Sequence, residues 1–261
     1  MSSTIEAPPP WMAALEVRAL GELAALELTT PLRRLLPTGD GHDVIVLPGF
    51  TADDRSTRPL RRLLGDIGYR THGWGLGENL GPTPKILRGV RELLLRVHAE
   101  HAAPVSIIGW SLGGIFAREL ARSEPSMVRQ VITLGSPIQM IERDASSVQG
   151  RYEAVRHLHD PSMRRDVRAA FGPLLEVPAT SVYSRTDGIV SWQASLIRRT
   201  ATSENIRVYG SHCGLGFNVS VAYAIADRLT QEQGRWTPFS PPLLLRGWYP
   251  RADDLDPSRL P

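Results

Sequence analysis

Residues 105–114 read Val-Ser-Ile-Ile-Gly-Trp-Ser-Leu-Gly-Gly, an apolar run that ends in the pattern G-x-S-x-G. The apolar run predicts a buried strand, and the residues after the pattern have the spacing of a helix. Where a strand turns so sharply into a helix, the serine between them adopts a strained conformation and its Oγ projects from the turn, which only glycine-sized neighbours allow. The pattern therefore predicts Ser111 as a nucleophile. The alternative is a serine that merely caps the helix.

Short apolar runs alternate with amphipathic stretches along most of the chain. We expect strands near 44–48, 69–74, 105–110, 129–135, 179–184 and 205–209, and helices near 54–66, 83–101, 112–123 and 217–231. This repetition predicts an α/β domain with a mostly parallel sheet of about six strands, flanked by helices on both faces. Ligands of such sheets bind at the carboxyl ends of the strands, so functional residues should lie in the loops that follow them.

We interpret residues 1–261 as a single domain with additional segments at both ends. Residues 1–41 form an N-terminal helical segment, in which a helix near 11–35 should pack against the body of the protein. Its apolar positions at helical spacing are Leu15, Ala19, Leu23 and Leu26, while Glu16, Arg18, Glu22 and Glu27 lie elsewhere on the helical wheel. Residues 234–261 are rich in proline and should lie extended along the surface.

The connection over residues 138–177 interrupts the strand–helix rhythm. Its middle, residues 152–171, predicts one or two helices broken at Pro161. A long connection at the ligand-binding edge is commonly a lid, so we expect a cap-like insertion, with an ordinary crossover helix as the alternative. The apolar residues that would line such a cap are Met163, Val167, Phe171, Leu174 and Leu175.

A serine nucleophile needs a base and an acid that orients the base, and in this type of fold both follow the serine along the chain. Of the seven histidines, only His212 lies in a loop after a late strand, and Asp187 lies in a turn directly after the preceding strand. Glu142 and Asp144 follow an earlier strand and compete with Asp187 as the acid. Purely structural roles stay open: Asp-Gly is a common turn pair, and a loop histidine can bond to the main chain.

Two main-chain N–H groups should form the oxyanion hole. One belongs to the residue after the nucleophile, Leu112, and the other to the turn after the first core strand, where Phe50 follows a Pro-Gly pair. Main-chain donors leave little trace in side chains, so this expectation rests on position along the chain.

Five segments together resemble the α/β-hydrolase superfamily, especially its bacterial serine esterases and lipases. They are LPGF at 47–50, GWSLGG at 109–114, ITLGSP at 132–137, RTDGIV at 185–190 and GSHCGLGFN at 210–218. The resemblance covers about residues 42–231 and implies Ser111 as nucleophile, Asp187 as acid and His212 as base. The Gly49-Phe50 pair looks like the oxyanion turn of lipases and departs from the HGGG motif of many short-acyl esterases.

This reading predicts a serine carboxylic ester hydrolase that forms an acyl-enzyme and acts on a small-molecule or lipid-like acyl ester. A thioesterase or an acyltransferase could use the same triad. A catalytically silent binding domain of the same fold is the alternative from another class, because fold alone does not fix function.

Composition excludes several other classes. Thirty basic against 27 acidic residues leave a net charge of +3 with no basic cluster, so no nucleic-acid partner is expected. The single cysteine, Cys213, permits no intrachain disulfide, which fits a reducing compartment, and the first residues do not resemble a secretory signal, so we expect a cytoplasmic protein. The longest uncharged stretch, 208–226, is interrupted by polar residues and glycines and makes a poor membrane span.

We expect neither a metal nor a cofactor. His157 and His159 are two residues apart and would point to different sides of a helix, and no metal-binding motif is present. The glycine-rich segment 73–77 follows a strand, but prolines delay the next helix, which favours a loop lining the site over a dinucleotide fingerprint.

Overall fold

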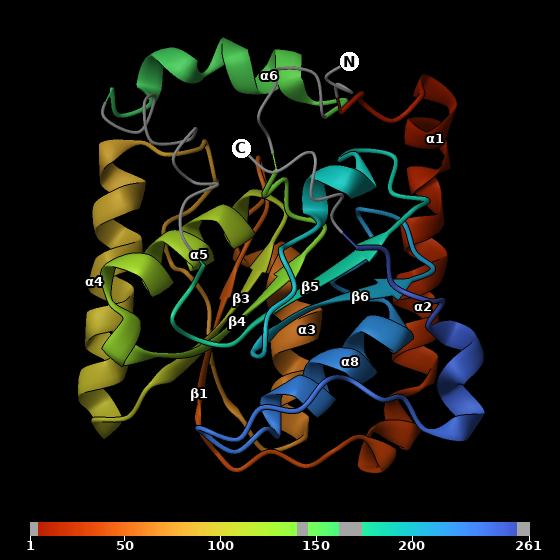
Figure 1. The fold of residues 1–261 in the computed structure, drawn as a ribbon. Helices are drawn as coiled ribbons and strands as arrows, with labels where there is room; N and C mark the ends of the chain where they lie inside the picture. Colours follow the sequence, from red (N-terminus) through yellow and green to blue (C-terminus); the bar gives the residue numbers. More distant parts are fainter. Residues whose placement is uncertain (1–4, 140–145, 162–173, 255–261) are drawn as a thin grey trace.

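The computed structural model describes residues 5–139, 146–161 and 174–254 (Figure 1). In this part of the chain, six strands form one sheet in the order β2-β1-β3-β4-β5-β6, and every neighbouring pair is parallel. The strands are β1 (Asp43–Leu47), β2 (Arg70–His72), β3 (Val105–Trp110), β4 (Val128–Leu134), β5 (Ala179–Ser184) and β6 (Ser203–Val208). The predicted parallel sheet is confirmed, with boundaries within a few residues of those expected.

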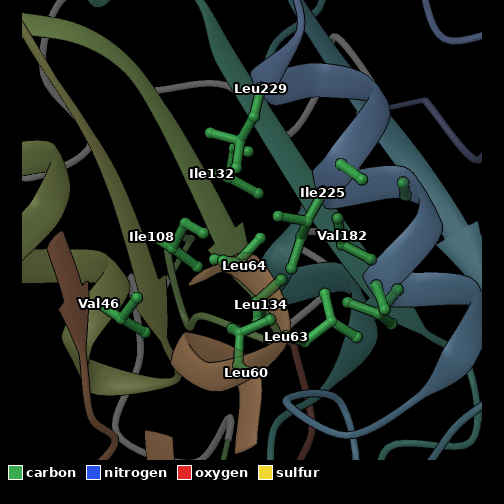
Figure 2. Packing of buried hydrophobic residues seen from close by; sticks show 14 of the residues in the cluster. Val46, Leu60, Leu63, Leu64, Ile108, Ile132, Leu134, Val182, Ile225 and Leu229 are labelled. Atoms are coloured by element: carbon green, nitrogen blue, oxygen red, sulfur yellow. The ribbon is translucent and has the colours of Figure 1, made fainter. Parts of the chain in front are cut away.

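Helices cover both faces of the sheet. On one face lie α3 (Asp54–Asp66) and α8 (Val219–Leu229), and on the other α4 (Pro84–His101) and α5 (Leu112–Ser123). The alternating directions of strand side chains explain the two cores. Val46 and Ile108 face α3 and α8, as Figure 2 shows, whereas their neighbours Ile45 and Ile107 face α4 and α5.

The order of the strands places the functional edge of the sheet. From β1 the chain passes through α3 to β2 on one side, and then returns through α4 to β3 on the other side of β1. The carboxyl ends of β1 and β3 are therefore a topological switch point, where loops leave the sheet in opposite directions and a ligand can enter between them. Residues 48–50 and Ser111 follow these two strand ends.

The N-terminal segment is helical, and its predicted apolar face is correct at Leu26 but wrong at Leu15. It consists of α1 (Pro10–Ala14), the 3₁₀ turn η1 (Leu15–Arg18), α2 (Ala19–Leu28) and the 3₁₀ turn η2 (Thr30–Leu35). Leu15 is 45% exposed, whereas Glu16 is only 8% exposed. A 3₁₀ turn has three residues per turn, so the apolar stripe of a continuous α-helix does not continue through it. Leu26, farther along in α2, is buried as expected.

The remaining described segments are short. After β4 come α6 (Gln149–Ala154) and the 3₁₀ turn η4 (Arg156–Leu158), and the rest of the predicted helical stretch, residues 162–171, lies outside the described residues. Further 3₁₀ turns are η3 (Pro125–Met127), η6 (Trp192–Ser195) and η7 (Leu243–Trp248). In the C-terminal tail, the Tyr249 hydroxyl donates to the Ser220 carbonyl at 2.7 Å and its ring packs on the core. In the described part of the chain, every helix is too short or too polar to cross a membrane.

We expect Gly113→Ala to lower the free energy of unfolding by about 1–3 kcal/mol, because a Cβ there would lie 2.4 Å from the Leu47 carbonyl oxygen and 2.7 Å from that of Pro48. Gly21→Ala in α2 is the matched control, since a Cβ there meets nothing within 4 Å. Because alanine favours a helix more than glycine does, this substitution should raise the free energy of unfolding by about 0.5–1 kcal/mol. Urea unfolding measures both. Equal effects of the two substitutions would contradict the packing argument.

Candidate active site

The turn between β3 and α5 has the strained geometry that the G-x-S-x-G pattern predicts. Ser111 has φ 52° and ψ −122°, a left-handed conformation that costs a non-glycine residue energy. Both flanking glycines are needed for packing: a Cβ on Gly109 would lie 2.4 Å from the α-carbon of Gly114, and one on Gly113 would collide with the end of β1. Helix α5 is therefore pressed against the sheet, and Ser111 is left half-buried at the sheet edge.

The turn after β1 lies directly beside Ser111. A Cβ on Gly49 would lie 3.2 Å from the Ser111 Cβ and 3.8 Å from its Oγ, so the main chain at this position approaches the hydroxyl closely. Within the described ranges, the main-chain N–H groups of Phe50 and Leu112 have no protein acceptor. The two expected oxyanion donors thus belong to segments that meet at the serine.

Asn79 holds this turn in place, a role that the sequence did not indicate. Its side chain is fully buried, and its Nδ2 donates to the Pro48 carbonyl at 2.8 Å. The Asn79 carbonyl accepts the Thr51 N–H at 2.8 Å, and the Asn79 N–H donates to the Ala52 carbonyl at 2.9 Å. These bonds fix the residues on either side of Phe50.

The structure brings Asp187 and His212 together. The Asp187 Oδ2 lies 2.7 Å from the His212 Nδ1, and both side chains are buried. The other carboxylate oxygen, Oδ1, accepts the N–H groups of Ile189 and Val190 at 2.9 and 2.8 Å. Asp187 therefore shapes its own turn with one oxygen and orients the imidazole with the other. Because a carboxylate only accepts, the Nδ1 carries the proton and Nε2 of the neutral ring is free to act as a base.

Hydrogen bonds and close packing place this pair beside the serine turn. The Trp110 Nε1 donates to the His212 carbonyl at 3.0 Å, and Trp110 immediately precedes Ser111. The Ser111 N–H donates to the Leu134 carbonyl at 2.8 Å. A Cβ on the next residue, Gly135, would lie 3.0 Å from the Asp187 Oδ2 and 3.1 Å from the His212 Nδ1. The end of β4 thus touches the serine on one side and the acid–base pair on the other.

Opposing effects set the protonation of His212. Burial disfavours the imidazolium and lowers the pKa of His212, but the Asp187 carboxylate raises it, both by Coulomb attraction and by the hydrogen bond. Glu16 raises it further, and the net result is a pKa above the ordinary histidine value of 6.5.

Glu16, predicted to lie away from the core, is part of this site. One of its oxygens accepts the N–H groups of Gly188 and His212, and the other accepts that of Cys213. Nothing in the local sequence distinguishes it from the other acidic residues of the N-terminal segment.

Helix α6 packs against the turn after β1 through Tyr152. The Tyr152 ring packs edge-on against the Phe50 ring, with centroids 5.4 Å apart. At its near end, the Ser147 N–H donates to the Ile189 carbonyl at 2.8 Å, close to Asp187. Beyond α6 and the following turn η4, the His159 Nε2 lies 2.8 Å from the Leu80 carbonyl oxygen. The chain from 147 to 159 therefore runs from the acid turn to the loop after β2, above the carboxyl edge of the sheet (Figure 1).

Several predicted residues cannot be placed. The competing acids Glu142 and Asp144, and the apolar residues Met163, Val167 and Phe171, lie outside the described residues.

In the glycine-rich loop 73–77, Trp74 is buried and its Nε1 donates to the Gly77 carbonyl at 2.9 Å. Among the side chains that the structure describes, no group of three or more His, Cys, Asp or Glu residues could hold a metal ion.

Curated relatives share a single activity in their names. No protein-family model matches the chain. A pimeloyl-[acyl-carrier protein] methyl ester esterase of Pectobacterium atrosepticum is 27% identical over 183 residues, 61% of this chain and 68% of the relative. One of the same name from Aliivibrio salmonicida is 22% identical over 235 residues, 77% of this chain and 87% of the relative.

Solved structures of lipases and hydrolases have the same architecture. Aspergillus fumigatus lipase B superposes with a TM-score of 0.59 at 18% identity, covering 74% of this chain and 53% of the lipase. An alpha/beta superfamily hydrolase of Oenococcus oeni gives a TM-score of 0.50 at 16% identity, covering 72% of this chain and 91% of the hydrolase. The chain has the α/β-hydrolase fold. The resemblance inferred from its motifs is confirmed, and in this α/β-hydrolase fold the serine turn occupies the switch point of the sheet.

We expect Asp187→Asn to lower the pKa of the His212 imidazole, because the substitution removes the charge that stabilises the imidazolium. NMR titration of the imidazole resonances measures the shift. Glu142→Gln and Asp144→Asn serve as comparisons, and each should leave the titration of His212 close to that of the parent. If Glu142→Gln or Asp144→Asn lowered the pKa of His212 more than Asp187→Asn does, the residue that orients the histidine would lie in the segment after β4.

Proposed function

We propose that the protein is a serine carboxylic ester hydrolase, with Ser111 as nucleophile, His212 as general base and Asp187 as the acid that orients it. The observation that carries the proposal is the buried Asp187–His212 pair at 2.7 Å. The pair packs against Gly135, and the carbonyl of the preceding residue, Leu134, accepts the Ser111 N–H. The esterase names of the curated relatives support the same class of reaction.

The proposed reaction proceeds in two halves. In the first, the Ser111 Oγ attacks the acyl carbon and its proton passes to the His212 Nε2, while Asp187 stabilises the imidazolium. The N–H groups of Phe50 and Leu112 donate to the developing oxyanion, and the alcohol departs with the proton from His212. In the second half, His212 takes a proton from water, the hydroxide attacks the acyl-enzyme, and the proton returns to the Ser111 Oγ as the carboxylic acid leaves.

We propose that the acyl chain lies beneath residues 146–161, a described part of the connection over 138–177 that the sequence predicts to be a cap. The described part of this connection supports a roof, because Tyr152 covers Phe50 and residues 147–159 bridge two loops at the sheet edge. The relatives are named for a methyl ester of an acyl chain on a carrier, so a short alcohol and a medium-length acyl chain are the proposed substrate class.

We expect Ser111→Ala to leave a folded protein whose ester hydrolysis falls by about 10⁴- to 10⁶-fold, because the triad acts as a unit. The measurement is kcat on 4-nitrophenyl esters, with thermal unfolding as the control for folding. A fluorophosphonate should label the parent and fail to label the variant. A folded variant that kept more than about a tenth of the activity would exclude Ser111 as the nucleophile.

We expect acyl chains of about four to ten carbons to be preferred over acetyl by at least about tenfold in kcat/KM. Each buried methylene contributes about 0.8 kcal/mol, so lengthening acetyl to hexanoyl contributes at most roughly 3 kcal/mol. The measurement is kcat/KM for 4-nitrophenyl esters from acetate to palmitate. Tyr152→Ala should reduce the ratio of kcat/KM for the longer acyl chains to kcat/KM for acetyl. Tyr209→Ala is the control and should leave this ratio unchanged, because the Tyr209 side chain is 59% exposed. Acetate as the best substrate would indicate an open, short-acyl site.

A further inference from the structure

The Glu16 carboxylate joins the two loops that carry the proposed acid and base. Its Oε1 accepts the N–H of Gly188, the residue after Asp187, at 2.8 Å, and the N–H of His212 itself at 3.0 Å. Its Oε2 accepts the N–H of Cys213 at 2.7 Å. One side chain from the N-terminal segment therefore binds the main chain on both sides of the Asp187–His212 contact.

The orientation of Glu16 is unusual for an amphipathic segment. Its neighbours Leu15 and Val17 are 45% and 68% exposed, whereas the carboxylate points inward. Burying a charged group is costly unless hydrogen bonds compensate, and here three main-chain donors do so. Hydrophobic packing alone would bury Leu15. The hydrogen bonds of Glu16 with the two loops therefore decide which side of η1 faces the protein.

Two neighbours on the same segment bind the same loops at other points. Glu22 accepts the Ser211 N–H at 2.8 Å and the Ser211 hydroxyl at 2.7 Å. The Arg18 guanidinium donates to the Gly210 carbonyl at 3.1 Å and also to the carbonyl of Thr186. Among these three charged side chains, Glu16 alone bonds to the main chain of the histidine that would act as base.

We propose that Glu16 is a positioning residue of the hydrolytic site, which fixes the acid and histidine loops relative to each other and places a second negative charge behind the imidazole. The inference rests on the proposed function, since it concerns the same triad. It adds a residue from the N-terminal segment, nearly 200 positions before the histidine, to the groups that prepare His212 for proton transfer.

The charges around His212 give the sign of the expected effect. Asp187 faces the imidazole from the loop after β5, Glu16 lies behind its main chain, Cys213 is adjacent in the chain, and Arg18 and Glu22 contact the residues just before it. Negative charge favours the imidazolium, so removing the Glu16 charge should lower the pKa of His212. Because the base must be neutral, the rising limb of kcat/KM should move to lower pH.

A merely structural role predicts a different pattern. If Glu16 only anchored the segment, its loss would lower the melting temperature, while the folded fraction kept the parent's kcat and the parent's titration of His212. A positioning role also requires a fall in kcat, because the imidazolium formed in the transition state loses a stabilising charge and a fixed geometry. The two roles are therefore separated by a titration and a rate measured well below the melting temperature.

The experiment compares Glu16→Gln and Glu16→Asp with two matched controls on the full chain. Glu16→Gln removes the charge but nearly keeps the shape, and Glu16→Asp keeps the charge but shortens the reach by one methylene. Glu22→Gln removes a charge that binds the same loop through Ser211, and Glu27→Gln removes an exposed charge from α2. His212 is titrated by NMR, with its resonance assigned by its loss in His212→Gln, and kcat is measured against pH on 4-nitrophenyl esters.

We expect Glu16→Gln to lower the pKa of His212 by about 0.5 to 1 unit and kcat by about 10- to 100-fold. Glu16→Asp should retain most of the pKa of the parent and still lose kcat, and it serves as the second variant if the glutamine variant does not fold. Glu22→Gln should lower the melting temperature and leave the pKa of His212 unchanged. Glu27→Gln should change neither the melting temperature nor the pKa of His212.

The two readouts distinguish failure of this inference from failure of the proposed function. An unchanged His212 titration in Glu16→Gln, or a kcat within twofold of an active parent, overturns the role of Glu16 while leaving the esterase proposal in place. A parent that hydrolyses no ester refutes the proposed function, yet a shift of the His212 titration in the same variant would still support the electrostatic and positioning contact.

Discussion

The close approach of α5 to the end of β1 is the constraint on which the rest of the site depends. Gly113 lies so near the Leu47 and Pro48 carbonyls that a Cβ would collide with them, and Gly109 is pressed in the same way against Gly114. With the helix this close, the chain can leave β3 only through a left-handed residue, and that residue is Ser111. The same proximity brings the turn after β1, with its main-chain N–H groups, beside the hydroxyl.

Hydrogen bonding of buried polar groups then places the other residues of the candidate site. Asp187 divides its two oxygens between its own turn and the histidine, so neither is left without a partner. Asn79 satisfies the main chain of the turn after β1, and Glu16 satisfies three N–H groups of the loops that carry Asp187 and His212. The geometry of the candidate site is therefore held by hydrogen bonds of buried side chains, each fixed because burial leaves its polar atoms few other partners.

Much of this organisation follows from local patterns. The strand over 105–110, the helices over 54–66 and 112–123, and the parallel pairing of the strands agree with expectation, because apolar periodicity and glycine positions act over a few residues. The positions of Asp187 and His212 after late strands were predictable for the same reason: parallel strands bring their carboxyl ends to one edge.

The strand–helix order, the serine turn and the loops in which an acid and a base could meet are all predictable from the sequence, because each depends on short-range periodicity and steric fit. Only the folded structure shows that Asp187 contacts His212, that Asn79 binds the turn after β1, and that Glu16 points inward while Leu15 faces solvent. Glu16 and His212 are separated by 196 positions, and no local pattern records which distant N–H groups a carboxylate will satisfy. Only the folded chain brings those donors together, and their combined hydrogen bonds outweigh the apolar preference of a single turn.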